Sequence, residues 1–122
     1  MNTAEIKEAS RNFQAKEKRL ELENIKLWEV AALDAKKILN LCVRANPARV
    51  YQWGSVIHPE QFREWSDIDF ALEGLPTPES LFRLQEACEK TTRFPVHLVE
   101  IERLEPEYAE SIRENGRLVY EC

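Results

Sequence analysis

Trp53-Gly54-Ser55, an eleven-residue spacer and then Asp67-Ile68-Asp69-Phe70 form the most informative pattern in this chain. The β-prone residues 49–53 lead into the glycine, which predicts a strand that ends in a turn. Polar and apolar side chains alternate over residues 67–72, which predicts a second strand. Because strand side chains alternate between faces, both aspartates would project from one face, roughly 7 Å apart. We expect the fold to gather the glycine turn, the serine hydroxyl and the two carboxylates around one pocket.

Toward the C-terminus, helical and extended patterns alternate. Residues 78–92 predict a helix that starts at a proline, residues 95–101 predict a strand, and residues 106–114 predict a short helix before Gly116. Residues 118–120 predict a last edge strand. This order predicts an α/β (α+β) fold, in which a small, mixed, twisted sheet of three or four strands carries helices on one side.

Toward the N-terminus, residues 3–46 contain neither glycine nor proline and are rich in helix-forming residues. We expect helices over about residues 3–22 and 24–45, either separate or continuous, with an end at Asn46-Pro47. From Asn24 onward a broad apolar face is typical of a helix that lies on a core. We therefore predict a helical extension over residues 1–46, packed on or beside a core over residues 47–122, within one structural domain overall.

The outer part of this extension carries a narrow apolar stripe. Ile6, Phe13, Leu20 and Leu27 recur every seventh residue, but the positions between them are polar, so no sustained coiled coil is predicted. The stripe suits a contact with another molecule, including a homodimer through the N-terminal helix. It equally suits packing against the chain's own second helix.

The composition describes one small globular domain. The chain has 122 residues, of which 43% are hydrophobic and 32% charged, and its N-terminus has no apolar signal region. Three scattered cysteines match no zinc-binding spacing and suit reduced thiols, so we expect a cytoplasmic protein without a membrane partner.

The net charge of −5 divides into +2 over residues 1–48 and −7 over residues 49–122. Such an acidic surface repels phosphate backbones, so no long nucleic acid is expected as a partner.

The residues of the central pattern suit phosphate and metal chemistry. Two carboxylates held close repel each other unless a cation lies between them, and Mg²⁺ takes one or two carboxylates together with phosphate and water oxygens. Gly54 permits close backbone approach, so exposed N–H groups there and the Ser55 hydroxyl can grip a phosphate. Together the two halves of the pattern indicate phosphoryl or nucleotidyl transfer.

The pattern resembles the signature of the DNA polymerase β-like nucleotidyltransferase superfamily, and over about residues 48–120 the chain resembles its minimal nucleotidyltransferases. The resemblance implies that Asp67 and Asp69 are catalytic and bind two Mg²⁺, and that Gly54 and Ser55 bind the nucleotide phosphates. It also implies a nucleoside triphosphate such as ATP as substrate and a hydroxyl as acceptor. Minimal members often pair with a toxin that carries a HEPN domain, which makes such a toxin the expected partner.

The third carboxylate of the family is the main departure, because alignment places His97 at that position. A neutral imidazole accepts a proton but is a poor Mg²⁺ ligand. Glu100 would replace the missing carboxylate only if a bulge turned it to the same face. His58 and Arg63, in the spacer, are candidate accessory residues for a triphosphate, and surface positions are the alternative for both.

Two functions follow from these residues. The first is a Mg²⁺-dependent transfer of a nucleotidyl group, AMP from ATP, to a hydroxyl of a partner protein such as a HEPN toxin. The second is a catalytically degenerate member that acts as an antitoxin-like or regulatory binding partner. A small-molecule nucleotidyltransferase of the antibiotic-modifying kind would need an acceptor domain that this length accommodates only through dimerisation.

Overall fold

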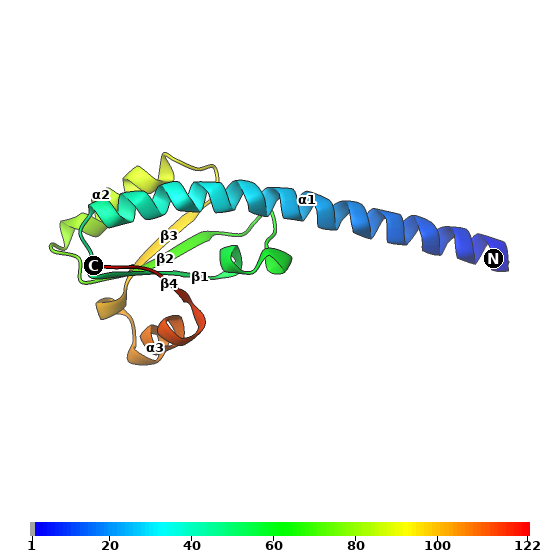
Figure 1. Cartoon of the computed structure of the whole chain (residues 1–122). Coiled ribbons are helices and arrows are strands. Elements are labelled where there is room, and N and C mark those ends of the chain that lie inside the picture. Colours follow the sequence, from blue (N-terminus) through cyan, green and yellow to red (C-terminus); the bar gives the residue numbers. More distant parts are fainter. Residues whose placement is uncertain (1) are drawn as a thin grey trace.

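The computed structural model describes residues 2–122 and consists of one four-stranded sheet with three α-helices (Figure 1). The elements follow the chain as α1 (Thr3–Arg44), β1 (Arg49–Trp53), η1 (Ser55–Ile57), η2 (Pro59–Gln61), β2 (Ile68–Glu73), α2 (Glu79–Glu89), β3 (Val96–Glu100), η3 (Ile101–Arg103), α3 (Pro106–Asn115) and β4 (Arg117–Glu121), where η marks a short 3₁₀ turn. The predicted fold class is confirmed.

The strands lie in the order β3-β2-β1-β4, and the sheet is mixed. β1 runs antiparallel to both β2 and β4, whereas β2 and β3 are parallel, because α2 returns the chain to the same end of the sheet before β3 begins. At the outer edge of β3, the Gln85 side chain of α2 donates to the carbonyl of Val96 (2.7 Å) and accepts from the amide of Leu98 (3.2 Å). The side chain of Gln85 thus occupies backbone groups that a further strand would use.

The helices divide between the two faces of the sheet. α1 and α2 cover one face, where the main core gathers around Ile68, Phe70 and Leu72 of β2. α3 covers part of the opposite face, where a smaller cluster forms around Tyr51, Ala71 and Ile112. The expectation of helices on one side therefore describes α1 and α2, and α3 is the exception.

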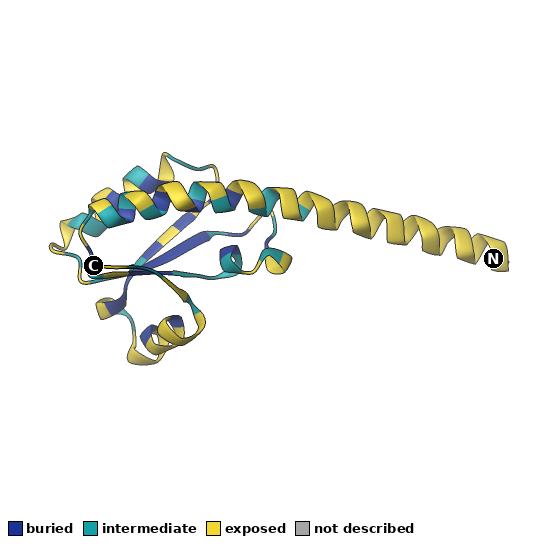
Figure 2. Cartoon of the chain, in the orientation of Figure 1, coloured by how far each residue is buried: buried dark blue, intermediate teal, exposed yellow. Residues whose placement is uncertain are grey.

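α1 is one continuous helix of 42 residues, so the two predicted helical stretches join. At its start, the Asn2 side chain accepts from the Glu5 amide and the Glu5 carboxylate accepts from the Asn2 amide, which forms a capping box. At its end, Asn46 adopts a positive φ of 60° and Pro47 prevents continuation. Every side chain from residue 3 to residue 23 is exposed (Figure 2).

Within residues 2–122, none of the helices combines the length and the apolar character that crossing a membrane requires.

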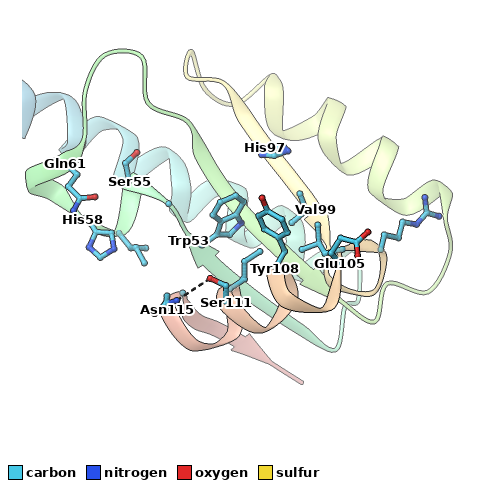
Figure 3. A pocket seen from close by; sticks show the side chains of 16 residues that line it. Trp53, Ser55, His58, Gln61, His97, Val99, Glu105, Tyr108, Ser111 and Asn115 are labelled. Atoms are coloured by element: carbon cyan, nitrogen blue, oxygen red, sulfur yellow. Dashed lines mark hydrogen bonds between the residues drawn. The ribbon is translucent and has the colours of Figure 1, made fainter.

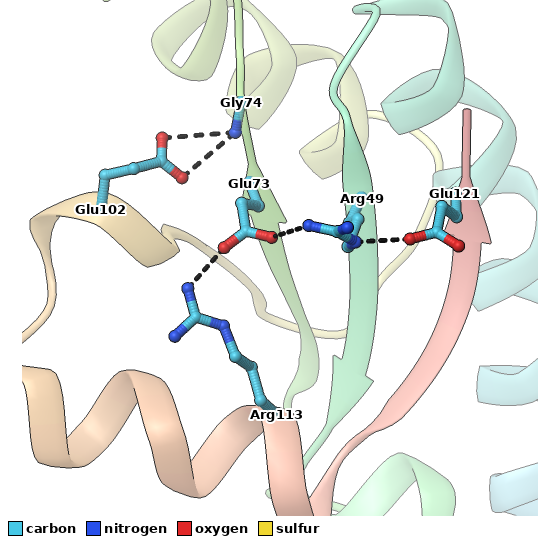
Figure 4. A network of polar contacts seen from close by, with 6 residues as sticks. All are labelled: Arg49, Glu73, Gly74, Glu102, Arg113 and Glu121. Carbon is cyan, nitrogen blue, oxygen red and sulfur yellow. Dashed lines mark hydrogen bonds and ion pairs between the residues drawn. The ribbon is translucent and has the colours of Figure 1, made fainter.

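A network of ion pairs joins α3 to the strands at the end of the sheet away from Gly54 (Figure 4). Arg49 of β1 donates to Glu73 of β2 (2.9 Å) and to Glu121 of β4 (2.6 Å). Arg113 of α3 also donates to Glu73, and this hydrogen bond is the main reason why the pKa of the Glu73 carboxyl lies below its usual value. The Glu102 carboxylate accepts from the Gly74 amide at 3.1 Å. These contacts hold α3 on the sheet and thereby fix one wall of the cavity described below.

Candidate functional site

The parallel pairing of β2 with β3 brings Asp69 and His97 together. These residues are register partners on neighbouring strands, and both project from the face that α3 covers. His97 Nδ1 lies 3.6 Å from Asp69 Oδ1. The Asp69 side chain is 10% exposed, whereas that of His97 is 58% exposed. The position to which alignment assigns the third carboxylate therefore lies next to the buried aspartate, with its ring open to solvent.

The turn after β1 lies directly against the same carboxylate. Gly54 has φ 78° and ψ −164°, a region of backbone conformation that is essentially restricted to glycine. A Cβ built on Gly54 would overlap the Asp69 carboxylate, so only glycine lets the turn pass this closely. Ser55 follows as the first residue of η1. The structure thus brings the two halves of the motif, separated by eleven residues, into contact.

Burial and charge act together on Asp69. The pKa of its carboxyl is raised to about 6, first by burial and then by the charge of Asp67, while His97 acts in the opposite direction. Asp67 precedes β2 and is half-buried. Above pH 6 the site therefore holds two mutually repelling negative charges, one of them largely removed from water. A cation that binds both carboxylates would relieve this repulsion.

A cavity of about 700 Å³ lies between the sheet and α3 (Figure 3). Gly54, Ser55 and His97 line it, whereas Asp67 and Asp69 are not among its lining residues, so the expected gathering of both carboxylates around this one pocket is not found. Trp53 and His97 line it from the strands, and their ring centroids are 6.1 Å apart. Tyr108, Ser111 and Asn115 line it from α3, and Asn115 Nδ2 lies 3.3 Å from Ser111 Oγ. The Trp53 Nε1 atom is buried and has no hydrogen-bond partner among the described residues. The cavity is large enough for a small organic ligand and presents both aromatic and polar groups to it.

The α3 residues of the cavity were not predicted from the sequence. Tyr108, Ser111 and Asn115 are spaced i, i+3 and i+7, which places them on one side of the helix, next to the side that carries the buried Ala109 and Ile112. This spacing is the sequence signal that relates these three residues to one another. On its own it is indistinguishable from a solvated helix face, and only the position of α3 makes it a cavity wall.

The candidate accessory residues are placed differently from one another. His58 lines the cavity, and its Nδ1 lies 3.8 Å from a Glu60 carboxylate oxygen. Arg63 donates to the backbone carbonyls of Glu60 and Phe62, so its guanidinium holds the spacer loop together. Glu100 does not join the Asp69 carboxylate, because β3 pairs in regular register without a bulge and alternation turns Glu100 to the other face. Its carboxylate instead pairs with Arg103 at 2.8 Å.

The donor set suits Mg²⁺ only in part. Among residues 2–122, no group of three or more His, Cys, Asp or Glu side chains is arranged to hold a metal ion. Asp67 and Asp69 supply the one or two carboxylates that Mg²⁺ takes when phosphate and water oxygens complete its coordination. His97 adds a nitrogen and no negative charge, which Mg²⁺ disfavours. The residues therefore fit a metal that arrives with phosphates, and they do not form an all-protein metal cage.

The fold and the motif geometry together define a nucleotidyltransferase-type protein. Residues 36–122 match the model of the family described as Polymerase beta, Nucleotidyltransferase, and the chain belongs to this family. The matched region includes the end of α1 as well as the whole sheet. The resemblance inferred from the motif is therefore confirmed.

Two solved structures share the fold. One, described as "putative minimal nucleotidyltransferase", is 27% identical with a TM-score of 0.62, over 73% of this chain and 92% of that one. The other is a crystal structure of a toxin–antitoxin with AMP-PNP, 21% identical with a TM-score of 0.60, over 72% of this chain and 73% of that one. No match is found among curated proteins.

Proposed function

We propose that this chain binds a nucleoside triphosphate together with Mg²⁺ and transfers its nucleotidyl group to a hydroxyl of a partner protein. The observation that carries the proposal is the contact between the Gly54 turn and the Asp69 carboxylate. This contact joins the phosphate-binding and carboxylate halves of the family motif at the edge of a cavity large enough for a nucleotide.

Each motif residue has a definite task in this proposal. The backbone N–H groups of the turn and the Ser55 hydroxyl hold the triphosphate, because the missing side chain of Gly54 lets phosphate oxygens approach the backbone. Asp67 and Asp69 hold the metal. When bound there, Mg²⁺ neutralises phosphate charge and polarises the reacting phosphoryl group.

The transfer step balances with groups that the chain and the substrates supply. The acceptor oxygen attacks the α-phosphorus, the bond from that phosphorus to the oxygen bridging to the β-phosphate breaks, and pyrophosphate leaves with that oxygen. The proton of the acceptor hydroxyl passes to a base beside the reacting atoms. His97 can act as this base because its ring lines the cavity and remains accessible to solvent.

ATP and a protein acceptor are the best-supported choices of substrate. A structure that shares the fold is a toxin–antitoxin crystallised with AMP-PNP, an ATP analogue. The acidic surface of residues 49–122 also favours a basic protein over a nucleic acid as partner. We therefore propose AMP as the transferred group and a HEPN-type toxin as the acceptor.

A second function is favoured by one observation, the presence of His97 beside Asp69 where the family has a carboxylate. With His97 in place of a third carboxylate, and no group of three metal-binding side chains among residues 2–122, the site would bind a nucleotide without transferring it. The chain would then act as an antitoxin-like binding partner in which the nucleotide stabilises the bound state.

Calorimetry with Mg²⁺-ATP tests nucleotide binding. We expect binding by the wild-type chain and at least a 100-fold loss of affinity in the Asp67→Asn/Asp69→Asn double variant, because the metal and its phosphates lose both carboxylates. Glu107→Gln/Glu110→Gln is the matched control, since it removes two exposed carboxylates from α3 and should bind normally. Equal heats in the wild type and the Asp67/Asp69 variant would refute the metal–nucleotide proposal.

Intact-mass analysis after incubation with ATP and a candidate toxin separates the two functions. An added AMP on the toxin supports transfer. Binding of ATP without any mass change in the toxin supports the binding-partner function, and His97→Asp should then create transfer that the wild type lacks. Transfer by the wild-type chain that His97→Ala abolishes would assign the proton acceptor to His97.

A further inference from the structure

The distal segment of α1, residues 3–23, extends away from the rest of the molecule (Figures 1 and 2). At 1.5 Å per residue, its 21 residues span about 32 Å. Ile6, Phe13 and Leu20 form an apolar stripe along it and are 55%, 62% and 49% exposed. A helix of this length gains little stability in water without a packed face, so the stripe calls for a partner surface.

The stripe continues the side of α1 that packs on the sheet. Phe13 precedes the buried Ala31 by eighteen residues, and Leu20 precedes the buried Ile38 by the same interval. Eighteen residues are five whole helical turns, so each pair lies on the same side of the helix. Whatever covers the stripe therefore lies on the same side of α1 as the sheet, next to the end of the body formed by residues 24–122.

We propose that the stripe pairs with the same stripe of a second copy of this chain, with the two helices antiparallel and related by a two-fold axis at Phe13. Phe13 is the midpoint of residues 3–23, and Ile6 and Leu20 each lie seven residues from it. Rotation about Phe13 therefore places Ile6 opposite Leu20 of the second copy and Phe13 opposite its own counterpart. This spacing makes the stripe self-complementary, as a two-fold interface requires.

The residues beside the stripe also match under this rotation. Ala9 comes opposite Lys16 of the second copy, and Ser10 comes opposite Glu17, so a small side chain meets a long one at each contact. The long side chains can lay their methylene groups over the small residues. Lys16 and its counterpart are about 9 Å apart along the helix axis, which keeps the like charges separate.

The body of the chain excludes the parallel arrangement. A parallel helix on the stripe would continue past residue 24 on the side where the sheet, η1 and η2 pack against α1. In the antiparallel arrangement the second helix begins near that point, and its own body lies beyond the first copy's N-terminus. The two helices can therefore overlap along the whole distal segment, residues 3–23, before either one meets the body of the other copy.

The charge distribution supports a second copy as the occupant. Residues 3–23 carry five basic and five acidic side chains and are neutral, so the whole net charge of −5 lies on the remainder of the chain. An antiparallel pair joins the two neutral segments and keeps the two acidic bodies at opposite ends. Self-association through any surface of the body would instead bring like net charges together.

Sedimentation velocity on the full chain over a range of concentrations tests the pairing. We expect the wild type to form dimers and Phe13→Glu to raise the dimer dissociation constant at least 100-fold, because the two-fold axis brings both introduced carboxylates together. Leu22→Glu is the matched control: Leu22 is 60% exposed and lies on the opposite side of the helix from Leu20. Its dimer should be unchanged. Circular dichroism on each variant checks that helix content is retained.

Disulfide trapping tests the orientation, in a Cys122→Ser background that removes the exposed native thiol. Ile6→Cys and Leu20→Cys chains should cross-link when they are mixed, and neither should cross-link alone. Cross-linking of Ile6→Cys with itself would refute the antiparallel arrangement. A wild-type chain that remains monomeric at several hundred micromolar, or dimers that Phe13→Glu and Leu22→Glu weaken equally, would refute the pairing itself. The dimer should form without ATP, so its outcome is separate from that of the nucleotide-binding test.

Discussion

The two faces of the sheet differ most clearly along β2, where neighbouring residues serve opposite purposes. Ile68, Phe70 and Leu72 point toward α1 and α2 and are at most 1% exposed. Asp69 and Ala71 lie on the opposite face, where Ala71 packs in the cluster with α3 and the Asp69 carboxylate lies against Gly54 and His97. One six-residue strand therefore supplies both the centre of the core and a buried carboxylate of the candidate site.

The difference reflects how completely each face is covered. α1 and α2 pack on the first face over the main apolar core and leave a cavity of about 280 Å³ beside it, whereas α3 covers only part of the second face and leaves a cavity of about 700 Å³. Burial of an ionised carboxylate opposes folding, and apolar burial on the first face offsets that cost. The candidate site therefore lies on the face opposite the main core, where burying the Asp69 carboxylate does not disrupt the packing of that core.

Phe70→Ala should show the largest effect on the free energy of unfolding, since it removes a large side chain from the main apolar core. Phe70 is 1% exposed, so we expect a loss of about 3–5 kcal/mol in the free energy of unfolding. Val99→Ala, at a half-buried position on the α3 face, should cost much less. Urea denaturation measures both. Equal losses would mean that the two faces contribute equally to stability.

Gly54→Ala should damage the site as well as the fold. The alanine must adopt a backbone conformation reserved for glycine, and its methyl group would overlap the Asp69 carboxylate. We expect this to lower the free energy of unfolding by about 2–3 kcal/mol. Because the carboxylate must move, Mg²⁺-ATP binding should be lost as well.

Gly74→Ala is the matched control for this variant. Gly74 has a similar φ of 76° and a close neighbour in Ala48, but it lies at the other end of β2. It should lose stability and keep nucleotide binding. If both variants lost binding to the same degree, the effect of Gly54→Ala would be one of general destabilisation.

The sequence pattern was sufficient for the parts of this comparison that depend on local alternation. The alternation over residues 67–72 predicted a strand with a carboxylate face and an apolar face, and alignment to the family motif selected His97 as the residue that would lie near Asp69. The first is a local property of a strand, so it survives in the folded chain. The second depends on the pairing of β2 with β3 and came from the resemblance to the family. The same reasoning required a bulge to bring Glu100 to the site, and β3 has none.

The features that depend on packing between distant elements could not be predicted in this way. The side of the sheet that α3 covers is set by the chain's path after β3 and by contacts such as Arg113 with Glu73. The cavity and its lining by Tyr108 follow from that placement. Likewise, a glycine after a strand indicates a turn, but its contact with a carboxylate fifteen residues later is a tertiary property.

Asp69→Asn should show the smallest change in the free energy of unfolding, and this change should be a gain in stability where the other variants show a loss. In the metal-free protein the folded-state pKa of Asp69 is about 6, above the roughly 3.9 of an unfolded aspartate. Between these values the folded state binds more protons than the unfolded state, so wild-type stability falls as pH rises from about 4 to 6. Two pKa units correspond to roughly 3 kcal/mol. The variant also loses its contact with His97, so we expect a gain of about 1–2 kcal/mol at pH 7.5 that disappears near pH 4.

Urea denaturation in EDTA at pH 4.0, 6.0 and 7.5 measures this difference in the free energy of unfolding. The contributions of the other titrating groups are the same in wild type and variant, so they cancel in the difference. Asp67→Asn sharpens the test, because removing the neighbouring charge should lower the pKa of Asp69 and shift the pH dependence to lower values. A stability gain of the same size at pH 4.0 and 7.5 would show that it does not arise from ionisation of Asp69. The α3 face would then owe its lower stability to incomplete packing alone, and the electrostatic half of the comparison would have to be abandoned.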